Sequence, residues 1–96
     1  MTNNKKIIEE CIFKAIDSFN ETSNKIHLKK SGSQKIMSED SNLDSLDIIN
    51  FITACEKSLS ENYNSMINLL NEDTLNPLSN NLESIENIVM YIRDNY

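Results

Sequence analysis

The chain has 96 residues, of which 39% are hydrophobic and 25% are charged, and this size and composition are typical of one small globular domain spanning residues 1–96. One glycine, one proline and no tryptophan leave too few turn residues for an all-β domain, so we expect an all-α fold. The net charge of −6 is uneven: residues 1–38 carry seven lysines against four acids, and residues 39–96 carry eleven acids against Lys57 and Arg93. This acidic half disfavours nucleic acid as a partner and suits a basic protein surface, although acidity also serves solubility alone.

The first predicted element is an amphipathic helix over about residues 4–20. Its apolar residues recur at the three- and four-residue spacing of one helix face: Ile8, Cys11, Ile12, Ala15, Ile16 and Phe19. Glu9, Glu10 and Lys14 interrupt this stretch and exclude a signal-peptide core, and no apolar run reaches the roughly 18 residues of a membrane span. We therefore expect a cytoplasmic protein without membrane insertion.

Residues 21–43 lose this periodicity and are predicted to form a long loop. Gly32 favours a turn, and four apolar residues are expected to pin the loop to the core: Ile26, Leu28, Ile36 and Met37. The loop also carries a basic cluster: Lys25, His27, Lys29, Lys30 and Lys35. Because no aromatic residues are interleaved and the rest of the chain is acidic, we interpret this cluster as a solvated loop rather than a nucleic-acid site. His27 has no companion residues for a metal or catalytic site.

A second helix is predicted from Asp44 or Ser45 to about residue 60. One apolar stripe is expected in the core: Ile48, Phe51, Ile52, Cys55 and Leu59. A second row lies partly round the helix and suits a docking surface, although isolated exposed apolar residues are also ordinary: Leu46, Ile49, Thr53 and Glu56. The two cysteines lie in apolar helical patterns without a CxxC pair, so we expect buried free thiols rather than a disulfide.

Two further helices complete the prediction. A short helix over about residues 65–71 is indicated by Met66, Ile67, Leu69 and Leu70. A final helix over about residues 84–93 has its apolar face at Ile85, Ile88, Val89 and Ile92. Ser84 suits its N-cap, and Arg93 suits the negative end of its dipole.

Ser45, between Asp44 and Leu46 at the predicted start of the second helix, has three possible roles: a helix cap, a nucleophile or an attachment point. A serine at a helix start is most often a cap. A phosphate attached there would be stabilised by the free N–H groups and the positive end of the helix dipole. The sequence supports no glycosidase-style carboxylate pair, glycine-rich phosphate loop or EF-hand spacing, so we do not expect an enzyme.

The stretch LDSLDIINFI, residues 43–52, resembles the signature of the acyl carrier proteins, the phosphopantetheine-binding carriers. KIMSEDSN before it and LESIENIVMYI near the end are also similar to that family. The resemblance implies a small four-helix bundle with a long loop between the first and second helices. It also implies that Ser45 carries a 4′-phosphopantetheine arm derived from coenzyme A. Partner recognition would then involve Asp44, Leu46, Asp47, Ile49, Thr53 and Glu56.

The same resemblance implies a monomeric carrier whose arm holds an acyl or aminoacyl group as a thioester. Its partners would be a phosphopantetheinyl transferase and the enzymes that load and transfer the cargo. Asn50, Thr53 and Lys57 depart from the dense acids of fatty-acid carriers, and residues 60–81 form a longer segment than the family has there. These departures favour a specialised pathway, such as polyketide, nonribosomal peptide, D-alanyl or surface-glycan acylation. The alternative is an unmodified acidic helical module that binds a basic protein, with Ser45 acting as a cap.

Overall fold

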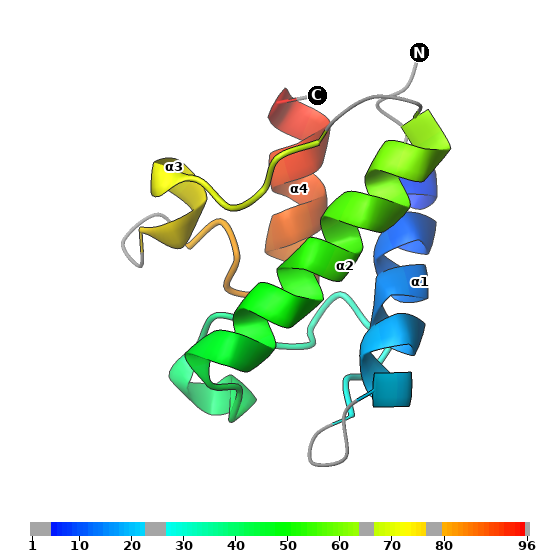
Figure 1. Ribbon diagram of the computed structural model, residues 1–96. Helices are drawn as coiled ribbons and strands as arrows, with labels where there is room; N and C mark the ends of the chain where they lie inside the picture. The colour runs from blue at the N-terminus through cyan, green and yellow to red at the C-terminus, as the bar shows by residue number, and fades with distance from the viewer. Residues whose placement is uncertain (1–4, 23–26, 64–66, 77–79, 96) are drawn as a thin grey trace.

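The computed structural model describes residues 5–22, 27–63, 67–76 and 80–95. These residues form helices and no strand: α1 (Lys5–Thr22), the 3-10 turn η1 (Glu39–Ser41), α2 (Ser45–Tyr63), α3 (Glu72–Leu75) and α4 (Ile85–Asn95). The helix α1 packs against both α2 and α4, and it runs in the opposite direction to them (Figure 1). The all-α prediction is therefore confirmed, with three long helices and one short helix, α3, among the described residues.

The core is formed by the apolar stripes of the three long helices. Every predicted core residue of α1 is buried, as are Phe51, Ile52, Cys55 and Leu59 of α2, and Ile48 is half-buried against the same core. The rings of Phe19 and Phe51 meet edge to face, with centroids 6.0 Å apart and planes at 87°. Burying each large aliphatic or aromatic side chain contributes about 1.5–3 kcal/mol, so this shared core holds α1 against α2.

The connection between α1 and α2 is pinned to the segment that precedes α4. The Ile36 amide donates to the Glu83 carbonyl at 2.8 Å, and the Met37 amide donates to the Leu82 carbonyl at 2.9 Å. An isolated antiparallel bridge joins Lys35 to residue 84. These bonds satisfy backbone groups that a buried loop would otherwise leave unpaired.

The predicted pinning residues of this connection behave largely as expected. Leu28 and Ile36 are buried, and Met37 is half-buried against the core. Ile26 lies outside the described residues. Asn20 fixes the loop to the end of α1, because its side-chain amide donates to the Leu28 carbonyl at 3.0 Å and accepts from the Leu28 amide at 2.8 Å.

The short helix predicted over residues 65–71 is wrong for the described part, residues 67–71, which are not helical. Ile67 and Leu69 are buried, but they pack in an irregular segment, and the short helix begins at residue 72 instead. Asn71 caps it, since its side chain accepts from the Thr74 amide at 3.0 Å while the Thr74 hydroxyl accepts from the Asn71 amide at 3.1 Å. Ser65 and Met66 lie outside the described residues.

The final helix agrees closely with its prediction. Ser84 Oγ accepts from the Asn87 amide at 3.3 Å, which confirms Ser84 as an N-cap. Arg93 lies in the last turn of α4, at the negative end of the helix dipole.

Candidate functional site

The start of α2 is set by a tight turn at residues 38–42. Ser38 caps η1 by accepting from the Asp40 amide at 3.2 Å, and the Ser41 hydroxyl donates to the Ser38 carbonyl at 2.8 Å. Asn42 then adopts a left-handed conformation with φ of 63°, which asparagine tolerates better than most residues. This residue is the C-cap of η1 and lies three residues before the start of α2 at Ser45.

Asp44, and not Ser45, is the N-cap of α2. Asp44 Oδ1 accepts from the Asp47 amide at 2.8 Å, and Asp47 Oδ2 accepts from the Asp44 amide at 3.4 Å. The Asp44 carbonyl also accepts the first helical bond, from the Ile48 amide at 3.0 Å. This reciprocal pair is a capping box with aspartate at both positions. The interpretation of Ser45 as the cap is therefore wrong, because the neighbouring carboxylates already satisfy the helix end.

Ser45 is the first residue of α2, and its side chain is exposed. Its hydroxyl makes no hydrogen bond to any residue that the structure describes, and the amides of Ser45 and Leu46 find no acceptor there either. The hydroxyl is thus free to react and lies at the positive end of a 19-residue helix. Such a position suits a covalently attached phosphate, whose charge the free amides and the dipole would stabilise.

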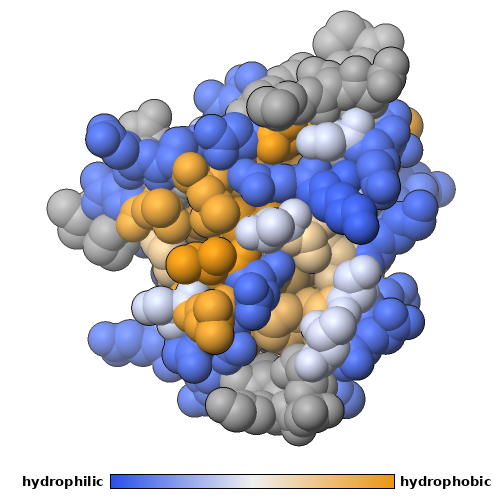
Figure 2. All heavy atoms as spheres, viewed as in Figure 1, coloured by the Kyte–Doolittle hydropathy of each residue, from blue (hydrophilic) through white to orange (hydrophobic). Residues whose placement is uncertain are grey.

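Exposed apolar side chains adjoin this serine. Leu46 is 65% exposed and Ile49 is 45% exposed, and Thr53 is exposed on the same side of α2. In the space-filling view, hydrophobic surface extends from the first half of α2 toward α3 (Figure 2). Leu75 of α3 is also 44% exposed. The second row predicted on α2 is therefore presented to solvent at Leu46, Ile49 and Thr53.

Glu56, the last predicted member of that row, has an internal structural contact. Its Oε2 accepts from the Leu69 amide at 2.6 Å and from the Leu70 amide at 3.2 Å. Ser60, one turn further along α2, accepts from the Ile67 amide at 3.2 Å. These two side chains hold the irregular segment 67–71 onto α2. Periodicity could not reveal this role, because it depends on backbone groups 7 to 14 residues away.

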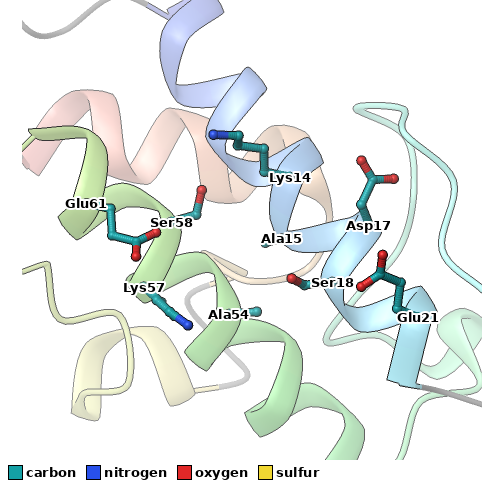
Figure 3. A pocket seen from close by; sticks show the side chains of 9 residues that line it. All are labelled: Lys14, Ala15, Asp17, Ser18, Glu21, Ala54, Lys57, Ser58 and Glu61. Atoms are coloured by element: carbon teal, nitrogen blue, oxygen red, sulfur yellow. The ribbon is translucent and has the colours of Figure 1, made fainter.

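A hollow of about 330 Å³ lies in the seam between α1 and α2, away from Ser45 (Figure 3). Its lining combines small residues with both signs of charge: Lys14, Ala15, Asp17, Ser18, Glu21, Ala54, Lys57, Ser58 and Glu61. Ala54, its nearest lining residue along α2, follows Ser45 by nine positions, or about 13 Å at 1.5 Å per residue. This hollow and the serine are therefore separate features.

Both cysteines are free and buried, as predicted. Burial raises the pKa of the Cys11 thiol, although a hydrogen bond with Ser58 and the charge of Lys14 oppose the shift. Burial raises the pKa of the Cys55 thiol well above its ordinary value of 9.0, and the charge of Glu56 adds to this. Both thiols are therefore protonated near neutral pH and unsuited to act as nucleophiles.

Comparison with known proteins gives a negative result. No protein-family model, curated protein or solved structure matches the chain. None of the helices that the structure describes has the length and apolar character needed to cross a membrane. A functional assignment therefore depends on the chemistry of this chain's own residues.

Proposed function

We propose that this protein is an acyl carrier protein, carrying a 4′-phosphopantetheine arm on Ser45. The observation that supports this proposal is that Asp44 and Asp47 cap α2, which leaves the Ser45 hydroxyl exposed and without a hydrogen bond among the described residues. Attachment of a phosphate at Ser45 would break no contact that the structure describes. A serine that served as the cap would lose its structural role on modification.

The residues around Ser45 fit an attached phosphodiester. Its negative charge would meet the unsatisfied amides at the start of α2, an arrangement that contributes about 0.3–1 kcal/mol at an exposed helix end. Asp44 and Asp47 bring negative charge close to the same place, but both carboxylates are engaged with backbone amides. When bound, the arm supplies a terminal thiol that holds an acyl or aminoacyl group as a thioester.

The exposed face of α2 next to the serine suits recognition by partner enzymes. Leu46 and Ile49 offer apolar contacts, and exposed Thr53 extends this face along the helix. A phosphopantetheinyl transferase and the enzymes that load and remove the cargo would read this surface, while the carrier itself catalyses no step. We propose that it acts as a cytoplasmic monomer, in a four-helix carrier bundle formed by the single domain.

The charge pattern of α2 supports a specialised pathway over general fatty-acid synthesis. Asn50, Thr53 and Lys57 are all exposed, so a partner would meet neutral and positive groups where a dense acidic surface would otherwise lie. Partner surfaces select by complementary charge, and this pattern disfavours a strongly basic partner. Polyketide, nonribosomal peptide, D-alanyl and surface-glycan acylation remain the candidate pathways.

The test is the intact mass of the purified chain after incubation with coenzyme A and a broad-specificity phosphopantetheinyl transferase. We expect the wild-type chain to gain the mass of one arm, and Ser45→Ala to gain none. Ser18→Ala, which removes an exposed serine from α1, is the matched control and should be modified fully. A wild-type chain that stays unmodified would overturn the proposal. It would favour the unmodified protein-interaction module, for which the exposed Leu46, Ile49 and Leu75 offer a docking surface.

A further inference from the structure

Residues 29–35 of the α1–α2 connection form a loop whose two ends are joined by hydrogen bonds. The loop contains three members of the basic cluster: Lys29, Lys30 and Lys35. Gln34 spans its two ends, because Oε1 accepts from the Lys29 amide at 2.9 Å and Nε2 donates to the Lys35 carbonyl at 3.0 Å. The Gln34 amide also donates to the Ser31 carbonyl at 3.1 Å. The backbone positions of the two lysines are thereby fixed relative to each other.

The start of α4 anchors this loop. The Glu86 amide donates to the Gly32 carbonyl at 2.9 Å, and the Ile85 amide donates to the Gln34 carbonyl at 3.0 Å. Both amides belong to the first turn of the helix and have no partner within it. The Gly32 and Gln34 carbonyls therefore satisfy two amides at the start of α4. The same two bonds hold the loop in one conformation.

A hollow of about 260 Å³ opens beside the braced loop. It is lined by Lys29, Ser31, Ser33, Gln34, Lys35 and Asp40. The Ser31 and Ser33 hydroxyls lie 2.9 Å apart, so one donates to the other and two hydroxyl groups are gathered on one side. Lysine, serine and glutamine residues of one short loop thus line a single space.

The two lysines of the hollow have no carboxylate partner among the described residues. Neither Lys29 nor Lys35 forms an ion pair there, whereas Lys30, between them in the sequence, pairs with Asp17 at 2.8 Å. Asp40 lines the same hollow but lies beyond ion-pair distance from both ammonium groups. The charged side chains that line the hollow are thus two lysines and one aspartate, a net charge of +1 that attracts an anionic ligand.

We propose that this hollow binds the phosphate group of a small phosphorylated molecule. Phosphate oxygens accept charge-assisted hydrogen bonds from lysine and further bonds from hydroxyl and amide donors, and these are the donors that the loop presents. In this arrangement the Asp40 carboxylate accepts a hydrogen bond from a hydroxyl or amine group in the rest of the ligand. The acidic character of the rest of the chain opposes an extended polyanion, which separates this site from a nucleic-acid interface. The proposal does not depend on modification of Ser45.

The test is a titration of the isotopically labelled chain, followed by the chemical shifts of its backbone amides. Inorganic phosphate and glycerol phosphate are the probes, and sodium chloride at equal ionic strength controls for screening. We expect saturable shifts confined to residues 29–35 and 40, with a dissociation constant of about 1 mM for inorganic phosphate. Glycerol phosphate should bind more tightly, and Asp40→Asn should remove that advantage.

Charge-matched variants separate the site from general attraction. Lys29→Gln combined with Lys35→Gln should weaken phosphate binding about tenfold, whereas Lys30→Gln combined with Lys57→Gln, which removes the same charge outside the hollow, should change it less than about twofold. Unsaturable shifts, equal shifts with chloride, or equal weakening by the two double variants would each overturn the proposal. A single-stranded oligonucleotide that binds the same residues more tightly than either phosphate compound would also overturn it. The chloride comparison uses the wild-type chain and does not depend on the folding of any variant.

Discussion

Replacing Glu56 by alanine tests a charge-assisted contact that joins α2 to the segment before α3. In the folded chain one carboxylate oxygen, Oε2, accepts from the Leu69 amide at 2.6 Å and from the Leu70 amide at 3.2 Å. Alanine leaves both amides without this acceptor at a half-buried position, beside the fully buried Leu69 side chain. The variant therefore removes two charge-assisted bonds without opening a large cavity.

The structure allows the loss of stability to be estimated. A hydrogen bond to a charged group contributes about 1.5–3 kcal/mol, and the lower value applies to a partly solvated carboxylate whose two bonds share one oxygen. Glu56→Ala should therefore lower the free energy of unfolding by about 2–3 kcal/mol, out of about 5–10 kcal/mol for a domain of this size. Glu56→Gln keeps a neutral oxygen acceptor in place and should cost about 1 kcal/mol.

Urea unfolding followed by circular dichroism measures these differences, and hydrogen exchange at the Leu69 and Leu70 amides locates them. Glu61→Ala is the matched control, because Glu61 is an exposed acid on the same helix without a hydrogen bond to another described residue. It should change stability by less than about 0.5 kcal/mol. Equal losses for Glu56→Ala and Glu61→Ala, or unchanged exchange at the two leucine amides, would refute the reasoning.

Three further predictions concern the start of α2 and the thiols. Asp44→Ala should cost about 1 kcal/mol in urea unfolding because it removes the N-cap, whereas Ser45→Ala should change stability by less than about 0.5 kcal/mol. Because burial raises the pKa of the folded Cys55 thiol well above 9.0, the unfolded chain loses this proton first as pH rises. Stability should therefore fall above about pH 9, by up to about 1.4 kcal/mol per pH unit for this group, and Cys55→Ala should lack that contribution in unfolding curves between about pH 8 and pH 10. An aromatic disulfide reagent should react with both thiols more slowly in the folded chain than in urea, because both are buried. In the folded chain it should react with Cys11 before Cys55, since Cys11 borders a surface hollow of about 300 Å³.

The spacing of apolar residues was sufficient to predict α1 and α4, each of which packs one face against the core. The stripe of α1 and that of α4 are buried as their spacing predicted, and Ser84 caps α4 as expected. These features depend on residues within one or two turns of each other, so a short window of sequence contains the information.

The spacing of apolar residues gave a wrong prediction where side chains of another helix bond to the backbone amides. Ile67 and Leu69 are apolar and close together, which indicated a helix, but their amides donate to Ser60 and Glu56 of α2 instead of to a helical turn. No local signal identifies those acceptors. Tertiary contacts override helix propensity at such positions.

The cap of α2 is an intermediate case, because the sequence does contain the deciding signal. Asp44 and Ser45 are both good N-cap residues, so the choice between them depends on what stands three positions later. Asp47 follows Asp44 at that spacing and can reach back to its amide, whereas Ile48 follows Ser45 and cannot. Testing each candidate for a capping box would have favoured Asp44 and left the hydroxyl of Ser45 free.

The pairing of residues 36–37 with residues 82–83 also determines how the chain can be divided. A fragment ending at residue 63 would keep α1 and α2 but lose the backbone partners of Ile36 and Met37, together with the apolar face of α4. Such a fragment should be largely unfolded alone and should regain helical structure when mixed with a peptide covering residues 67–95. Recovery of helical structure only on mixing would show that α1, α2 and α4 unfold as one cooperative unit, and the two fragments would then suit a split reporter.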